Sequence, residues 1–173
     1  MHYFVADLHA GDPSIIKYRK QFSTLAEHDA MIWELLSGLK QNDIVTFVGD
    51  CFIKLSAIDT LRKLPFKKEL VAGNHCFEKG VRFSDLVGVM DRIDGIRKWK
   101  HFWLSHAPLH PHHLRNRLNI HGHLHDVIIP DRRFINVSLE ASQYRLVSHE
   151  ELLDGRYRTY SKPYQPKVNS NES

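Results

Sequence analysis

The sequence is poor in cysteine, lacks a long apolar segment and shows no internal repeat. Cys51 and Cys76 are the only cysteines among 173 residues. Each stands beside a polar motif in a chain without a secretory leader, which predicts buried, reduced thiols near a site rather than a disulfide framework. No apolar run reaches the ~20 residues of a membrane-spanning helix. These absences exclude an integral membrane protein and predict a cytoplasmic location.

The length leaves room for one domain with a two-layer core and no second domain. With 42% hydrophobic and 25% charged residues, the chain has the composition of an ordinary globular protein. We expect a single domain over residues 1–154. Residues 155–173 are polar with little periodicity, and we expect them to form a loosely ordered tail.

Acidic residues are outnumbered, since 24 Lys and Arg against 20 Asp and Glu give a net charge of +4, with 13 His besides. Basic residues cluster at 17–20, 62–63, 67–68, 115–117 and 132–133. Solvated surface is the favoured interpretation of any one cluster. The alternative is a positive approach to a phosphate-bearing ligand. The clusters at 115–117 and 132–133 flank the last polar motif and are the best candidates for that role, although net charge alone does not indicate nucleic acid.

Five short polar motifs each follow a short apolar run. They are Asp7-Leu8-His9, Gly49-Asp50, Gly73-Asn74-His75, Ser105-His106 and Gly122-His123-Leu124-His125. Apolar runs rich in branched and aromatic residues are typical of buried strands. Ligands bind at the carboxyl ends of the strands in open α/β sheets. The spacing therefore predicts that all five motifs meet at one rim.

The residue types indicate a metal site. Two Asp, one Asn and four His supply oxygen and imidazole donors without a thiolate, which suits Mn, Fe, Zn, Ni or Co. Seven donors are too many for one tetrahedral ion but fit two ions that share one carboxylate. Two ions ~3.5–4 Å apart can clamp the oxygens of an in-line displacement at phosphorus. We predict two divalent ions, with Mn as the first choice.

The order D-x-H, G-D, G-N-H, H, G-H-x-H resembles the calcineurin-like metallophosphoesterase superfamily, and in particular its small single-domain phosphohydrolases. The resemblance extends over residues 1–147. It implies an α/β (α+β) fold, a four-layer αββα sandwich of two mixed β-sheets flanked by helices. It also implies a metal site at the carboxyl ends of the strands.

Roles carried over from that superfamily are implied for eight residues. The first metal ion would be held by Asp7, His9 and His125, the second by Asn74, His106 and His123, and both by Asp50. The catalytic residue would be His75, which faces the phosphate and protonates the leaving oxygen or stabilises the developing charge. The nucleophile would be metal-bound hydroxide.

The sequence departs from the superfamily pattern at two positions. Many members carry a second acid after the G-D motif, whereas Asp50 is followed by Cys51-Phe52-Ile53-Lys54. Many also follow G-N-H with Asp or Glu, whereas Cys76 stands here. A carboxylate at that position steadies the histidine and sets its tautomer. Asp12 and Asp94 are candidates to replace it.

The sequence favours a phosphodiesterase. The protein-phosphatase branch carries arginines after its G-D motif and before G-N-H, where this chain has Lys54 and Ala72. Without these two arginines, the chain lacks the positive charges that would bind a dianionic monoester. We predict hydrolysis of nucleotide-type or other small phosphodiesters, with nucleic acid as an alternative substrate and no membrane partner. The other hypotheses are a phosphomonoesterase, including a phosphoprotein phosphatase, and a non-catalytic binding scaffold.

Substrate contacts are predicted at His110, Arg115 and Arg117, because these residues lie between the last two motifs. The oligomeric state does not follow from the sequence.

The secondary structure expected from the patterns alternates early and is rich in strands late. A capping box at Thr24 and Glu27 predicts the start of the first helix. Further helices are expected over 56–64 and 83–91 and from Ser148. Strands are expected over 2–6, 44–48, 68–72, 95–98, 101–105, 118–121, 134–138 and 143–147.

Overall fold

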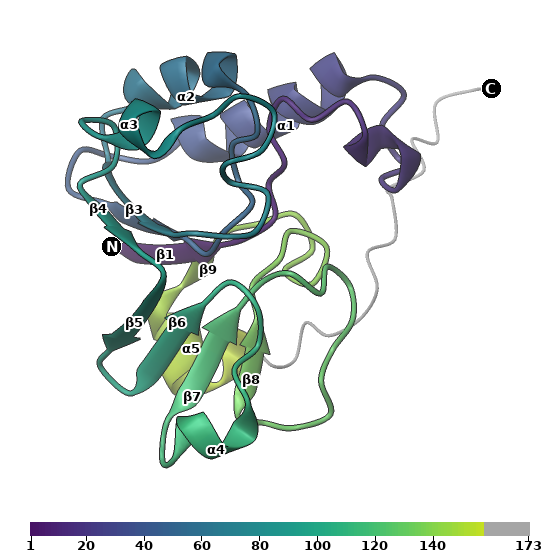
Figure 1. The fold of residues 1–173 in the computed structure, drawn as a ribbon. Helices are drawn as coiled ribbons and strands as arrows, with labels where there is room; N and C mark the ends of the chain where they lie inside the picture. The colour runs from purple at the N-terminus through teal and green to yellow at the C-terminus, as the bar shows by residue number, and fades with distance from the viewer. Residues whose placement is uncertain (158–173) are drawn as a thin grey trace.

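The computed structural model describes residues 1–157. The first of its two mixed sheets has five strands in the order β4-β3-β2-β1-β9 (Figure 1). These are β1 (His2–Val5), β2 (Ile44–Phe47), β3 (Lys67–Val71), β4 (Arg92–Asp94) and β9 (Val147–Ser148). Strands β1 to β4 pair in parallel and β9 runs antiparallel to β1. The carboxyl ends of four strands therefore share one edge.

The second sheet has four strands in the order β5-β6-β7-β8. They are β5 (Ile96–Trp99), β6 (Phe102–Ser105), β7 (Leu118–His121) and β8 (Phe134–Asn136). Strand β5 is antiparallel to β6, and the other pairs are parallel. Only Gly95 separates β4 from β5, so the chain passes from one sheet to the other at a single residue.

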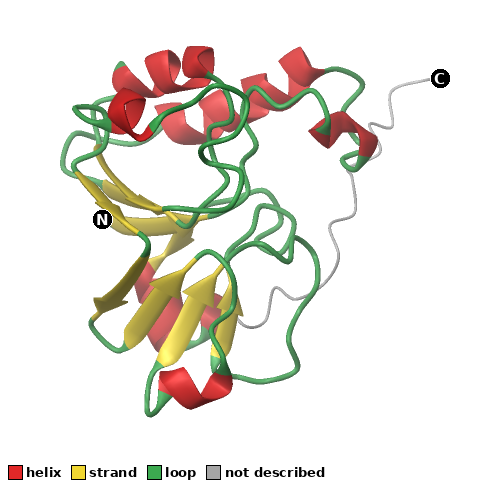
Figure 2. Cartoon of the chain, viewed as in Figure 1, coloured by secondary structure: helices red, strands yellow, loops and turns green. Residues whose placement is uncertain are grey.

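Helices flank the two sheets, which confirms the predicted fold class (Figure 2). They are η1 (Ile15–Lys17), α1 (Leu25–Ser37), α2 (Leu55–Arg62), α3 (Phe83–Leu86), α4 (Pro111–Leu114) and α5 (His149–Asp154). Helices α1 to α3 cover one face of the first sheet, and the second sheet lies beneath its other face. Helix α1 starts as predicted, because the Thr24 hydroxyl accepts the Glu27 N–H at 3.1 Å.

Two hydrophobic clusters hold these layers together. Successive side chains of a strand point to opposite faces, so neighbours in β1 belong to different clusters. Val5 packs in the cluster that contains Ile32 and Leu36 of α1. Phe4 packs in the cluster between the sheets, with Leu104 of β6. The second cluster packs the two sheets face to face. The loops that follow the carboxyl ends of their parallel strands therefore lie on the same side of the molecule.

Two expected elements differ from the structure, and one strand of the structure was not expected. The helix expected over 83–91 ends at Leu86, and Gly88 has a φ of 76°. Strand β4 was not expected. The strand expected over 143–147 is wrong, because Gln143 and Tyr144 have φ of 57° and 58°, values that interrupt an extended strand, and the pairing residues are Val147 and Ser148.

The tail predicted over 155–173 lies mostly outside the described residues. Of its first three residues, Tyr157 is buried, and its hydroxyl donates to the Asn136 carbonyl. No helix within residues 1–157 combines the length and the apolar character needed to cross a membrane.

Candidate metal centre

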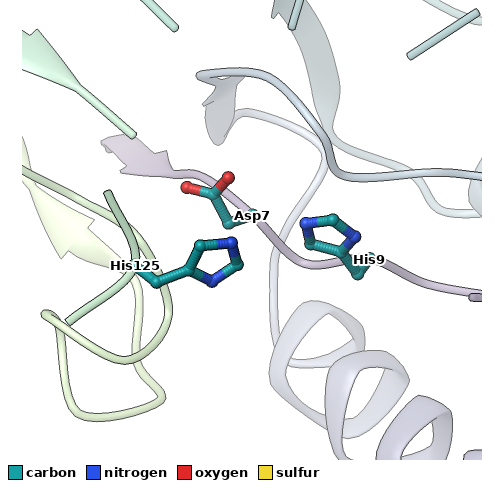
Figure 3. A group of neighbouring side chains, drawn as sticks. All are labelled: Asp7, His9 and His125. Carbon is teal, nitrogen blue, oxygen red and sulfur yellow. The ribbon is translucent and has the colours of Figure 1, made fainter. Parts of the chain in front are cut away.

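Six of the seven predicted ligands fall into two groups with the geometry of metal sites. Asp7, His9 and His125 form the first group, which Figure 3 shows as three side chains around a common space. The second group contains Asp50, His106 and His123. Within each group the candidate ligand atoms lie within 4.8 Å of one another.

Asn74, the seventh predicted ligand, joins the second group. Its Oδ1 lies 3.1 Å from His106 Nε2 and 3.1 Å from His123 Nδ1. His106 Nε2 is also 2.9 Å from an Asp50 carboxylate oxygen. The two groups adjoin, since His106 Nε2 lies 4.0 Å from Asp7 Oδ1. The predicted convergence of the motifs is therefore present in the geometry, whereas the metal-ligating roles stay predictions.

Hydrogen bonds to the far side of three rings leave a nitrogen available at the centre. His106 Nδ1 lies 2.9 Å from the Val48 carbonyl, which can only accept, so Nδ1 carries the proton and Nε2 keeps its lone pair. His125 Nδ1 lies 3.0 Å from Glu140, and His9 Nδ1 lies 3.4 Å from Asp12. Such contacts fix the tautomer and orientation of metal-binding histidines.

Two buried atoms of the first group have no hydrogen-bond partner within residues 1–157. They are Asp7 Oδ1 and His9 Nε2. Burying an unsatisfied polar atom is unfavourable by a few kcal/mol. A divalent cation beside both atoms would satisfy them with the oxygen and nitrogen donors that such ions prefer. The residues present therefore fit a metal ion.

The ionisation of the site shows competition between burial and local charge. Burial raises the pKa of Asp7. Burial opposes protonation of His106, yet the hydrogen bond and charge of Asp50 outweigh it and raise the His106 pKa. The hydrogen bond that His125 Nδ1 donates to the Glu140 carboxylate raises the pKa of His125. Burial lowers the pKa of His9 to about 4, so this imidazole is neutral at physiological pH.

The backbone is held in an unusual conformation at five of the seven predicted ligands. They have φ between 49° and 70° and are Asp7, His9, Asp50, His123 and His125. Residues with a side chain rarely adopt positive φ, and such strain concentrates at functional sites. The conformation turns the chain sharply just after each strand, and backbone bonds such as His9 N–H to the Asp50 carbonyl at 2.9 Å maintain it.

Two glycines of the motifs allow elements to approach closely. A Cβ at Gly49 would lie 2.2 Å from His106 Nδ1. A Cβ at Gly122 would lie 2.4 Å from the Ala6 Cβ and 2.5 Å from Asp7 Oδ2. Since real Cβ atoms do not approach so closely, only glycine fits these positions.

Gly122→Ala is expected to destabilise the protein and weaken metal binding. The new methyl group must displace Asp7 or the end of β1, which we expect to reduce the free energy of unfolding by about 1–3 kcal/mol. Thermal unfolding and metal titration would measure both effects. The matched control is Gly38→Ala, where φ is −72° and a Cβ meets nothing within 4 Å. Equal shifts in Tm for the two variants would contradict the steric argument.

Glu78 is the carboxylate that contacts His75. His75 Nδ1 lies 2.6 Å from Glu78 Oε2, and the backbone N–H of His75 donates to Asp50 Oδ1 at 2.8 Å.

The expectation that Asp12 or Asp94 would replace the missing acid is wrong. Asp12 bonds Ser14 and Lys79 beside His9, and Asp94 pairs with Arg92 and Arg97. The three-residue spacing between His75 and Glu78 is the signal that could have identified it.

Arg19 and Glu140 support the first group and were not recognised from the sequence. Arg19 lies in a cluster interpreted as surface, yet it is 2% exposed. Its guanidinium donates to the carbonyls of Asp7 and Leu8 and to Glu140 at 2.8 Å. Burial would raise the Glu140 pKa, but contacts with His125 and Arg19 outweigh it and lower the pKa to about 2. Glu140 is therefore a permanent anion behind His125.

The two cysteines are free and buried near the site, as predicted. Cys76 Sγ accepts the backbone N–H groups of Asp50 and Gly73 at 3.3 and 3.2 Å. Burial raises the pKa of Cys76 to about 11. The thiol therefore acts as a neutral, space-filling acceptor and not as a nucleophile.

The three predicted substrate contacts do not join the cluster of ligands. His110 caps α4, where its Nδ1 accepts the His112 N–H at 3.3 Å. Arg115 and Arg117 precede β7, whereas the candidate ligands follow its carboxyl end. A cavity of about 1010 Å³ lies beside the first group, and neither arginine lines it. Its lining includes His9, Tyr18, His75, Lys79, His125 and Tyr144.

Comparison with known proteins reveals relatives whose names state no function. The chain is 29% identical over 160 residues to the uncharacterized protein MJ1445 of Methanocaldococcus jannaschii, covering 84% of this chain and 85% of that protein. The crystal structure of the protein of unknown function AQ665 from Aquifex aeolicus superposes with a TM-score of 0.70 at 25% identity, covering 89% of this chain and 98% of that one. No protein-family profile matches.

A weaker likeness is to the nuclease MPE of Pseudomonas putida. Its TM-score is 0.42 at 20% identity, over 72% of this chain and 60% of the nuclease. That score is too low to carry a functional argument.

Proposed function

We propose that this protein is a dinuclear metal-dependent phosphoester hydrolase of the calcineurin-like metallophosphoesterase superfamily. The observation that carries the proposal is the pair of adjoining groups Asp7/His9/His125 and Asp50/His106/His123, joined by Asn74. Seven donors in one place, two of their buried atoms without a hydrogen-bond partner in the described chain, indicate cations that complete the site. Asp50, the seventh donor, would be a ligand common to both ions.

Oxygen and imidazole donors suit Mn²⁺ first, with Fe, Zn, Ni and Co as alternatives. When bound, two divalent ions supply a hydroxide nucleophile at neutral pH and compensate the charge that develops on a transferring phosphoryl group. Asp7, His9 and His125 would hold one ion, and Asn74, His106 and His123 the other.

His75 is placed to act on the leaving group. It lines the cavity, and its ring centroid is 5.9 Å from that of His9. Because Nδ1 faces Glu78, Nε2 is the nitrogen that remains to face a substrate. The Glu78 carboxylate fixes the orientation of the ring, so that Nε2 is directed at the departing oxygen, to which it can donate a proton.

A phosphodiester substrate is favoured by the shortage of unengaged cations in the cavity. Among the described residues that line it, the lysine and arginine side chains are Lys79 and Arg19. Lys79 pairs with Asp12, and the buried Arg19 binds Glu140 and two backbone carbonyls. A dianionic monoester would lack the extra positive charge that it requires, whereas a diester carries a single negative charge.

The test is turnover of chromogenic esters by the purified, Mn²⁺-loaded protein, with metal content measured in the same sample. We expect bis(p-nitrophenyl) phosphate to be hydrolysed faster than p-nitrophenyl phosphate and a chelator to stop both reactions. Preference for the monoester would favour the phosphomonoesterase hypothesis. A metal-loaded protein inert to both esters would favour a binding scaffold.

A cytoplasmic location belongs to the proposal, supported by the two free thiols.

Activity is expected to fall below about pH 6 because ligand imidazoles must be neutral to bind metal. The pKa values of His106 and His125 are raised in the metal-free protein, so protons compete with metal as the pH decreases through those values. Metal affinity and kcat measured from pH 5 to 8 should decline together. A maximal rate at pH 5 would argue against histidine ligands.

A further inference from the structure

A second cavity lies at the end of the second sheet that is opposite the candidate metal centre. Its volume is about 640 Å³. Residues of β5 and β6, of α4 and of the segment before β7 line it, including Lys98, His101, Trp103, His113, Arg115 and Arg117. Figure 1 shows α4 beside the start of β7, whereas the candidate ligands follow the carboxyl ends of the strands. We call this cavity the basic groove.

The basic groove belongs to a stretch of sequence without acidic residues. From Gly95 to His125 there are 31 residues with no Asp or Glu and five Lys or Arg. Arg97 is buried and pairs with Glu69 and Asp94, so its charge is neutralised. The other four are Lys98, Lys100, Arg115 and Arg117. Since none of the described residues lining the groove is acidic, its positive charge is uncompensated.

Trp103 adds an aromatic surface to this charge. Phe102 and Leu104 point into the core between the sheets, so the alternation of the strand places Trp103 on the outer face. Lys98 is its register partner in β5, and the Lys98 ammonium lies 4.9 Å from the centre of the Trp103 ring. The pair places a cation beside a partly exposed indole, and movement of the Lys98 ammonium to a bound phosphate would free the ring face for a base.

Arg115 occupies a backbone conformation that an arginine rarely adopts. Its φ is 52° and its ψ is −116°, a region in which glycine is far less strained. The Arg115 side chain is exposed at the groove. A strained residue that contributes its charge to a cavity is a candidate for a binding role.

We propose that the basic groove binds single-stranded nucleic acid, with phosphates against Lys98, Arg115 and Arg117 and a base against Trp103. A cationic groove beside an aromatic ring is the usual arrangement for sequence-independent binding of single strands, whose bases are free to stack. An anionic lipid surface fits less well, because none of the large exposed apolar side chains of the described chain lines the groove. The groove contains none of the metal ligands.

The binding is tested on the full chain in the presence of EDTA, so that hydrolysis plays no part. Fluorescence anisotropy of a fluorescein-labelled single-stranded deoxythymidine 12-mer should rise with protein concentration. Three neutralised phosphates should give a log–log dependence of affinity on salt of about −2. The unlabelled duplex should compete less well than the single strand. Tighter binding of the duplex, or binding of phosphatidylserine vesicles without the 12-mer, would overturn the proposal.

Arg115→Gly separates binding from folding. The glycine relieves backbone strain, so Tm should stay the same or rise while the affinity for the 12-mer decreases about five- to tenfold and the salt slope shrinks by about 0.7. Trp103→Leu should weaken binding on the order of tenfold by removing the stacking surface.

The matched control is the Arg132→Gln/Arg133→Gln double variant. It removes two arginine charges that do not line the groove, and we expect its affinity to change less than twofold. If the double variant loses as much affinity for the 12-mer as Arg115→Gly does, binding depends on overall charge and not on the basic groove, and the proposal is overturned. If wild-type hydrolysis is absent, the proposed function fails while the binding result still decides the groove.

Discussion

Asp50→Asn is expected to abolish hydrolysis of bis(p-nitrophenyl) phosphate and to release metal from the purified protein. The substitution removes a negative charge whose oxygen lies 2.9 Å from His106 Nε2. The backbone N–H of His75 donates a hydrogen bond to Asp50 Oδ1 at 2.8 Å, and the side-chain carbonyl of an asparagine can still accept it. The expected loss is therefore one of charge and metal affinity and not of local structure.

Metal content by elemental analysis and turnover in the same sample measure the effect. Thermal unfolding in EDTA, where neither protein contains metal, measures separately the effect of losing the charged contact between Asp50 and His106. Asp59→Asn is the matched control, since Asp59 is an exposed aspartate of α2. Asp50→Asn protein with wild-type metal content and rate would refute the bridging role.

His75→Ala is expected to lower kcat by ~10²–10⁴-fold, the usual contribution of a general acid. The metal content should not change, because the His75 ring is bound to Glu78 and lies outside both ligand groups. His113→Ala, which removes an exposed imidazole from α4, serves as the control. A wild-type kcat in His75→Ala would assign the proton donor to another group.

Glu78→Gln tests whether Glu78 acts through the His75 ring. Glutamine has nearly the shape of glutamate but removes the charged oxygen that lies 2.6 Å from His75 Nδ1. We expect kcat to decrease while KM and metal content stay constant, because the ring loses the partner that fixes its orientation. An unchanged kcat would show that Glu78 does not position His75.

The candidate ligands could be found from the sequence because each directly follows an apolar run. A strand predicts where its last residue lies relative to neighbouring parallel strands, so Asp7, Asp50 and His106 could be placed together without coordinates. Glu78, Glu140 and Arg19 could not be identified in the same way. They reach the site from turns and loops, whose course depends on tertiary contacts such as those of Arg19 with two backbone carbonyls.

The place of Arg115 and Arg117 in the fold could not be predicted from their neighbourhood in the sequence. Both stand a few residues before the last motif, but the whole length of β7 lies between them and His123. Residues before a strand and residues after it occupy opposite edges of a sheet. The two arginines therefore lie in the basic groove and not among the candidate ligands.

The cluster of left-handed residues after β1, β2 and β7 has a consequence for the lifetime of the polypeptide. Five positive-φ residues and two unpartnered buried atoms of the described chain lie where metal ions would bind, so bound ions would stabilise the folded chain by mass action. When manganese is scarce, the loops at this edge should open more often and be cut sooner by proteases. Starvation for the metal would then reduce the amount of the protein as well as its turnover number.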